Sequence, residues 1–142
     1  MSTDTDRVSV RFKRPLLYVM SFLYTAAGVM HFVTPRAFAR IVPPRLPRPT
    51  VLVYLSGIAE IGLGIGLLFR RTRRRCAWGV IALLLAVFPA NVHMATSDMV
   101  PESVPDWATN SARVGLWARL PFQGVLVLWA WWYTRTMPEN GT

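Results

Sequence analysis

Long stretches with almost no charged side chains constrain this chain more than any other feature. The four stretches contain at most one charged residue each and run over residues 15–35, 50–69, 76–97 and 114–133. A helix needs roughly 20 mainly apolar residues to cross a hydrocarbon layer ~30 Å thick, so each stretch is long enough. Helices also satisfy their own backbone hydrogen bonds, which hydrocarbon requires. The sequence therefore predicts an all-α protein, a four-transmembrane-helix bundle.

The composition excludes other classes of protein. Apolar residues make up 53% of the chain and charged residues only 16%, whereas a soluble domain has about a quarter of its residues charged. The single cysteine, Cys76, excludes a disulfide scaffold. The net charge of +9 would indicate nucleic acid in a soluble protein. Here the basic residues lie mostly between the apolar stretches, as in membrane loops, so no nucleic-acid partner is expected.

The basic residues also predict how the helices run. Ten of the 16 lie at the chain ends or between the second and third stretches: Arg7, Arg11, Lys13, Arg14, Arg70, Arg71, Arg73, Arg74, Arg75 and Arg135. Positive residues favour the cytoplasmic side, so we expect a protein of the cell (inner) membrane with both termini in the cytoplasm. The excess of basic residues on the predicted cytoplasmic side is modest, because the loop after the first stretch carries four further arginines. The first stretch is too long for a signal peptide and is interpreted as a retained helix.

The expected organisation is a basic tail over 1–14, a membrane domain over 15–134 and a short tail over 135–142. Between the first two stretches, Thr34 and Pro35 form the pattern of an N-cap followed by a first-turn proline. This pattern predicts a short interfacial helix over 36–42, and the prolines that follow it end the helix before the second stretch.

Polar side chains within the apolar stretches are costly and need an explanation. Five of them are candidate ligand-binding residues: His31, Glu60, Asn91, Arg119 and Gln123. At a rise of about 1.5 Å per residue, Glu60 and Gln123 lie near the middle of the membrane and the other three in its outer part. This asymmetry predicts a polar cavity that opens toward the outer face.

Helical phase indicates which of these residues face the bundle. Tyr24 and His31 share one stripe of the first helix. A stripe of the second helix carries Val53, Gly57, Glu60 and Gly64. Glycines beside Glu60 permit a close neighbour helix or a ligand. Asn91 and His93 cannot both face inward, and we expect Asn91 inward and His93 near the outer interface. Pro89 is expected to kink this helix and free the carbonyl of Leu85.

Each candidate also has a simpler interpretation. Glu60 and Arg119 are expected to form an ion pair, which either only stabilises the bundle or also binds a ligand. Asn91 either bridges helices or binds a ligand, and a solvated or capping role is favoured for His31 over chemistry. Tyr24 is interpreted as a packing residue. Gly62 and Gly66 form a ridge on the second helix, which is interpreted as a packing surface for another helix. That helix either belongs to the same chain or to a second copy of it. The spacing of histidines and carboxylates predicts no metal site, and no catalytic residue is assigned.

Four motifs, each in the expected helix, resemble the DoxX family of small four-helix membrane proteins over about residues 15–134. They are Gly28-Val-Met-His31-Phe with Pro35 and Phe38, Ser56-Gly57-Ile-Ala-Glu60-Ile-Gly62, Phe88-Pro89-Ala90-Asn91-Val-His-Met94 and Arg119-Leu-Pro121-Phe-Gln123. The resemblance implies a relation to a thiosulfate:quinone oxidoreductase and to membrane assemblies that protect against oxidative stress. Glu60, Asn91, Arg119 and Gln123 match the family's polar pattern, with His31 beside them. The chain lacks the cysteines that thiosulfate chemistry would need.

Two hypotheses about function follow. In the first, the chain is a ligand-binding or redox-accessory subunit that takes an amphipathic small molecule, a quinone above all, from the outer leaflet and works with a redox-protein partner. Arg119 and Gln123 donate hydrogen bonds to it, Glu60 orients Arg119, and Asn91 completes the site. In the second, the chain is a structural scaffold or docking subunit with no ligand. Membrane lipids are partners in both, and the sequence leaves open whether the chain forms a homo-oligomer.

Overall fold

The computed structural model describes residues 4–135, and in that range the chain is helical with no strand. Its elements are α1 (Asp4–Val33), α2 (Pro35–Ile41), α3 (Pro49–Leu68), α4 (Arg73–Thr96), the 3-10 helix η1 (Asp106–Ala108) and α5 (Thr109–Thr134). The all-α prediction is confirmed. Three segments are long and apolar enough to cross a membrane: Arg11–Val33, Pro49–Leu68 and Arg73–Thr96. α5 is 26 residues long, but its polar and tryptophan residues make it less apolar than these three.

Some helix boundaries differ from the prediction. α1 continues through Pro15 toward the N-terminus, so residues 4–14 of the basic tail are helical. The short helix is present as α2, with Thr34 at its N-cap and Pro35 in its first turn. The Thr34 hydroxyl does not cap α2, because it donates to the Met30 carbonyl at 3.1 Å. Residues 136–142, most of the predicted C-terminal tail, lie outside the described residues.

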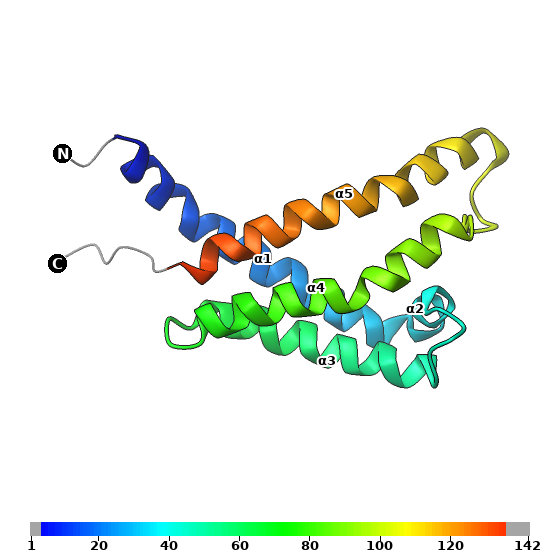
Figure 1. The fold of residues 1–142 in the computed structure, drawn as a ribbon, viewed down its shortest axis with the longest axis horizontal. Helices are drawn as coiled ribbons and strands as arrows, with labels where there is room; N and C mark the ends of the chain where they lie inside the picture. The colour runs from blue at the N-terminus through cyan, green and yellow to red at the C-terminus, as the bar shows by residue number, and fades with distance from the viewer. Residues whose placement is uncertain (1–3, 136–142) are drawn as a thin grey trace.

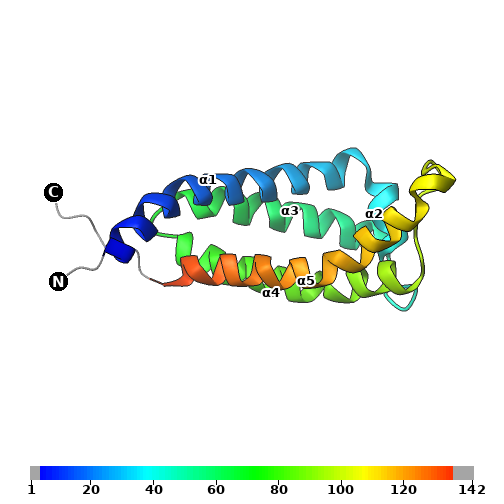
Figure 2. The ribbon, with the colours of Figure 1, turned by 90° about the horizontal axis from the view of Figure 1, so that it is seen from above.

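The long helices form two pairs. α1 packs along α3, and α4 packs along α5, while α3 and α4 join the pairs (Figure 2). The start of α1, the α3–α4 turn and the end of α5 lie together at what we call the arginine end (Figure 1). α2 and the α4–α5 loop lie at the opposite end, called the α2 end. From the arginine end toward the α2 end, α5 diverges from α1 (Figure 1).

Apolar packing holds the two pairs together in the arginine half. Its fully buried side chains come from all four long helices: Leu17, Met20, Leu67, Val80 and Tyr133. The Tyr133 hydroxyl also donates to the Lys13 carbonyl at 3.0 Å, which ties the end of α5 to α1. The polar candidates lie beyond this core, toward the α2 end, as the sequence predicts. The core therefore fixes the arginine half of the bundle, while Val53, Met94 and Ala95 are buried outside it, toward the α2 end.

Glycines let α1 and α3 approach until their backbones touch. A Cβ added to Gly28 would lie 2.6 Å from the Gly57 carbonyl oxygen, and one added to Gly57 would lie 2.8 Å from the Cβ of His31. Two turns further on, the Ser21 hydroxyl donates to the Gly64 carbonyl at 2.6 Å. The prediction that glycines beside Glu60 permit a close neighbour helix is confirmed. On the opposite face, Gly66 packs against Cys76, whereas Gly62 has no neighbour within 4 Å.

Candidate ligand-binding site

Glu60 forms its ion pair with His31. The Nδ1 atom of His31 on α1 lies 3.2 Å from Oε2 of Glu60 on α3, and the two side chains are only 11% and 13% exposed. The same Nδ1 lies 2.8 Å from the Ala27 carbonyl oxygen. Phe38 of α2 stacks on the imidazole, with the ring centroids 4.0 Å apart. The solvated or capping role favoured for His31 is therefore wrong, because α2 covers the imidazole and Glu60 shares it.

The predicted ion pair between Glu60 and Arg119 is also wrong. Nη1 of Arg119 instead contacts the sulfur of Met94 on α4 at 3.5 Å. The reason is the pairing of the helices: α3 packs on α1, whereas α5 packs on α4, and the described parts of α3 and α5 do not approach each other. Arg119 is exposed, and a long arginine side chain can extend along the helix to carry its charge to the surface.

Gln123 joins α5 to α4 through both ends of its amide. The side chain is 5% exposed, its Oε1 accepts a hydrogen bond from Nδ2 of Asn91 at 2.7 Å, and its Nε2 donates to the Leu84 carbonyl. The inward orientation predicted for Asn91 is confirmed. α4 contains Pro89 and bends along its length (Figure 1), and the carbonyl that receives Gln123 is that of Leu84 rather than Leu85. We call Leu84, Asn91 and Gln123 the Gln123 cluster.

His93 lies away from this cluster. Its Nδ1 atom is 3.1 Å from the Ser97 hydroxyl at the α2 end of α4. The adjoining loop is held to α5 by Asp98, whose carboxylate accepts hydrogen bonds from Nε of Arg113 at 2.7 and 2.9 Å. The hydrogen bond to Asp98 raises the pKa of the Arg113 guanidinium.

Replacing Gln123 by leucine is expected to lower the free energy of unfolding by about 1–2 kcal/mol, because the Asn91 amide then loses its partner inside the bundle. The nearby replacement Gly124→Ala is the control, since a Cβ there meets no atom within 4 Å. Both are measured by reversible unfolding in detergent micelles. Equal stability of the two variants would show that the Gln123 cluster does not hold α4 to α5.

The most informative feature of the site is a set of buried polar atoms without hydrogen-bond partners. Among the described residues there are three such atoms: Tyr24 Oη, Ser56 Oγ and Glu60 Oε2. Oε2 is at ion-pair distance from His31, but the imidazole N–H is directed to Ala27. A buried polar group left unpaired costs about 1–3 kcal/mol. The molecule therefore presents three groups that still need a partner.

These three atoms belong to one region. Ser56 lies one turn before Glu60 on α3, and Tyr24 lies two turns before His31 on α1. Tyr24 shares a stripe of α1 with Gly28 and His31, which meet α3 at Gly57 and Glu60. We call Tyr24, His31, Ser56 and Glu60 the Glu60 cluster. It offers two hydroxyl groups, a carboxylate and an imidazole, a set that suits a ligand with carbonyl or hydroxyl oxygens.

Sequence reasoning missed two of these residues in their present roles. Tyr24 is a packing residue, as interpreted, since it belongs to the apolar core, but its hydroxyl is an additional, unpartnered group. Ser56 was overlooked, although its spacing of four residues from Glu60 places both on one helix face. In the described part of the chain, no group of three or more His, Cys, Asp or Glu residues gathers.

Comparison with known proteins gives one match. The model of a family described as a domain of unknown function, DUF8561, matches residues 20–134, which contain the whole Glu60 cluster and the whole Gln123 cluster. Among curated proteins and among solved structures, none matches the chain.

Proposed function

The chain belongs to the DUF8561 family, whose domain has no known function, and we propose that it is a multi-pass membrane protein that binds a small amphipathic molecule at the Glu60 cluster. The argument rests on the chain's own residues. It has two parts, the position of the cluster in the membrane and the groups that the cluster offers. The resemblance to the DoxX family agrees with both.

We place four helices across the membrane, with α2 on the surface between the first two. α5 has 26 residues, which at about 1.5 Å each span ~39 Å, enough to cross the hydrocarbon layer. An even number of crossings agrees with the position of the start of α1 and the end of α5 at one end of the molecule (Figure 1). The basic residues of that end favour the cytoplasm. The α2 end, and with it the Glu60 cluster, then faces the outside of the cell membrane.

The observation that carries the proposal is the set of unpartnered atoms at Tyr24, Ser56 and Glu60. A quinone suits them, because its carbonyl oxygens accept hydrogen bonds from the two hydroxyl groups and the hydroquinone O–H donates to the carboxylate. It would enter from the outer leaflet between the helix pairs, which diverge toward the α2 end. The donors are therefore Tyr24 and Ser56 in place of Arg119 and Gln123, and we assign Gln123 and Asn91 to positioning α4 and α5.

A redox-accessory role extends this proposal. Reduction of a quinone takes two electrons and two protons, and the electrons would come from a partner redox protein. Glu60 and His31, 3.2 Å apart, are positioned to pass the two protons in succession to the quinone oxygens, with each group reprotonated from water after its transfer. This assigns the chain the tasks of holding the quinone and delivering both protons.

A titration with a short-chain benzoquinone tests the proposal on the full chain in lipid nanodiscs. Removing both hydroxyl groups with Tyr24→Phe/Ser56→Ala is expected to weaken binding roughly tenfold or more, since two hydrogen bonds are lost. The control Tyr54→Phe/Ser97→Ala removes the same groups outside the cluster and should bind like the unmodified chain. Equal dissociation constants for the two double variants would reject the Glu60 cluster as the site.

A scaffold is the second candidate, and the Gln123 cluster favours it, because that network is satisfied within the chain and joins two helices. A scaffold binds no quinone at any concentration tested. Its Tyr24→Phe/Ser56→Ala variant should be at least as stable as the unmodified chain, since two unpaired buried hydroxyl groups are removed at no loss of a bond. The titration and an unfolding measurement on the same variant thus separate the two functions.

A further inference from the structure

α2 and the loop that follows it present four arginines at the α2 end, which are Arg36, Arg40, Arg45 and Arg48. All four side chains are exposed, and among residues 11–135 none of them forms an ion pair with a carboxylate. Arg36 and Arg40 lie four residues apart on one face of α2, where like charges repel each other. We call these four arginines the basic surface. Its positive charge is not balanced within the described part of a single copy.

The α4–α5 loop presents the opposite charge. Glu102 and Asp106 are exposed, and within the same range of residues neither carboxylate has a basic side chain at ion-pair distance. Asp98, at the start of the loop, differs because Arg113 binds it. Trp107 follows Asp106 and is 85% exposed. We call Glu102, Asp106 and Trp107 the acidic surface. It suits arginine, because a guanidinium pairs with a carboxylate and also stacks on an indole ring.

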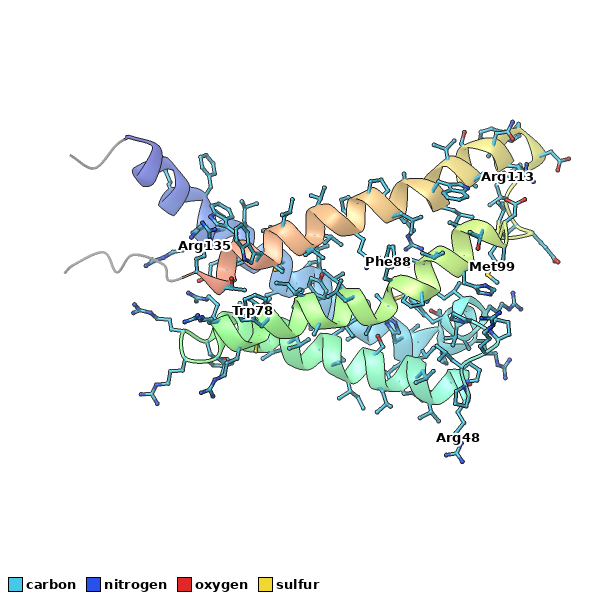
Figure 3. The ribbon with its side chains drawn as sticks, viewed as in Figure 1. Arg48, Trp78, Phe88, Met99, Arg113 and Arg135 are labelled. Atoms are coloured by element: carbon cyan, nitrogen blue, oxygen red, sulfur yellow. The ribbon has the colours of Figure 1, made fainter. Side chains whose placement is uncertain are left out.

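The two surfaces lie on different sides of the molecule but at the same end. α2 packs mainly on α3, whereas the acidic surface lies in the loop that joins α4 to α5 (Figure 1). Arg48 and Arg113, which are labelled in Figure 3, mark the two sides. Copies in one membrane share their orientation, so the basic surface of one copy lies at the level of the acidic surface of its neighbour.

We propose that copies of this chain associate side by side in the membrane, with the basic surface of one copy bound to the acidic surface of the next. One such contact gives partners to arginines and carboxylates that have none among the described residues of their own copy. Because the two surfaces lie on different sides, the contact is heterologous, and successive copies form a ring where the rotation between them closes. Anionic lipid headgroups would neutralise the arginines but repel Glu102 and Asp106, so a second copy fits both surfaces better.

Resonance energy transfer between donor-labelled and acceptor-labelled full-length chains in phosphatidylcholine vesicles measures this association. Arg36→Gln/Arg40→Gln is expected to weaken it roughly tenfold, because two positive charges leave the basic surface. Arg74→Gln/Arg75→Gln removes the same charge at the arginine end and is the control, which should associate like the unmodified chain. An unmodified chain that stays monomeric, or equal weakening in the two variants, would overturn the proposal.

Charge reversal provides a sharper test. Glu102→Arg/Asp106→Arg and Arg36→Glu/Arg40→Glu each place like charges at the contact, so neither variant should associate with itself. A mixture of the two should associate again, since the contact then joins opposite charges, and this recovery also shows that both variants fold. Reversed variants that stay apart in the mixture would contradict the proposal. Association that requires phosphatidylglycerol would also contradict it, because the arginines would then bind lipid headgroups. The Glu60 cluster takes no part in this test, which is independent of the proposed function.

Discussion

Replacing His31 by phenylalanine is expected to lower the free energy of unfolding by about 3 kcal/mol, because it removes the imidazole that lies 3.2 Å from the buried Glu60 carboxylate. The Glu60 side chain is only 13% exposed, and its 3.2 Å contact with Nδ1 of His31 is lost. Phenylalanine keeps a ring beneath Phe38, so the covering of the site by α2 is preserved. The measurement is reversible unfolding in detergent micelles, followed by circular dichroism.

The matched experiment adds Glu60→Leu to the same variant. With both members of the pair removed, no buried charge remains, and most of the lost stability should return. The double-mutant cycle isolates the pair from other effects of each replacement. If His31→Phe costs less than about 1 kcal/mol, or if the two replacements simply add, the pair does not contribute as the 3.2 Å contact implies.

Replacing Gly28 by alanine is expected to destabilise the bundle by about 2 kcal/mol, because one methyl group forces α1 and α3 apart. The new Cβ would lie 2.6 Å from the Gly57 carbonyl oxygen and 2.9 Å from the Ile61 nitrogen. Both are backbone atoms, which cannot move aside as a flexible side chain can. The separation of the helices would also lengthen the contact between His31 and Glu60, so ligand binding should weaken together with stability.

Gly62→Ala provides the control for this prediction on the same helix pair. A Cβ at Gly62 meets nothing within 4 Å, and alanine favours helix over glycine by up to about 1 kcal/mol. Its stability should equal or exceed that of the unmodified chain. A Gly28→Ala variant as stable as Gly62→Ala would mean that the close approach of α1 to α3 is not required.

The features that could be predicted from the sequence are those that depend on one helix at a time. The lengths of the apolar stretches predict α1, α3 and α4, and Thr34 with Pro35 predicts the start of α2. Helical phase gives the stripe that contains Gly57 and Glu60. Each of these depends on spacing along the chain, which the bilayer and the 3.6-residue period fix without reference to other helices.

The partner of Glu60 could not be predicted in this way, because it depends on which helices are neighbours. Arg119 and His31 are both basic residues in the outer part of their stretches, and hydropathy does not say whether α3 packs on α1 or on α5. A single serine such as Ser56 does not stand out either, since the hydroxyl of a serine in an apolar helix commonly donates a hydrogen bond to a backbone carbonyl of the preceding turn. Only the packing of α1 on α3 shows that its hydroxyl lacks a partner.

The presence of a ligand in the Glu60 cluster is the central claim, and gentle purification followed by native mass spectrometry and organic extraction tests it most directly. One amphipathic molecule per chain is expected from the unmodified protein, with loss from the Tyr24→Phe/Ser56→Ala variant and retention in Tyr54→Phe/Ser97→Ala. An unmodified chain that is empty when purified, and still empty after a quinone is added, would contradict the claim and favour the scaffold.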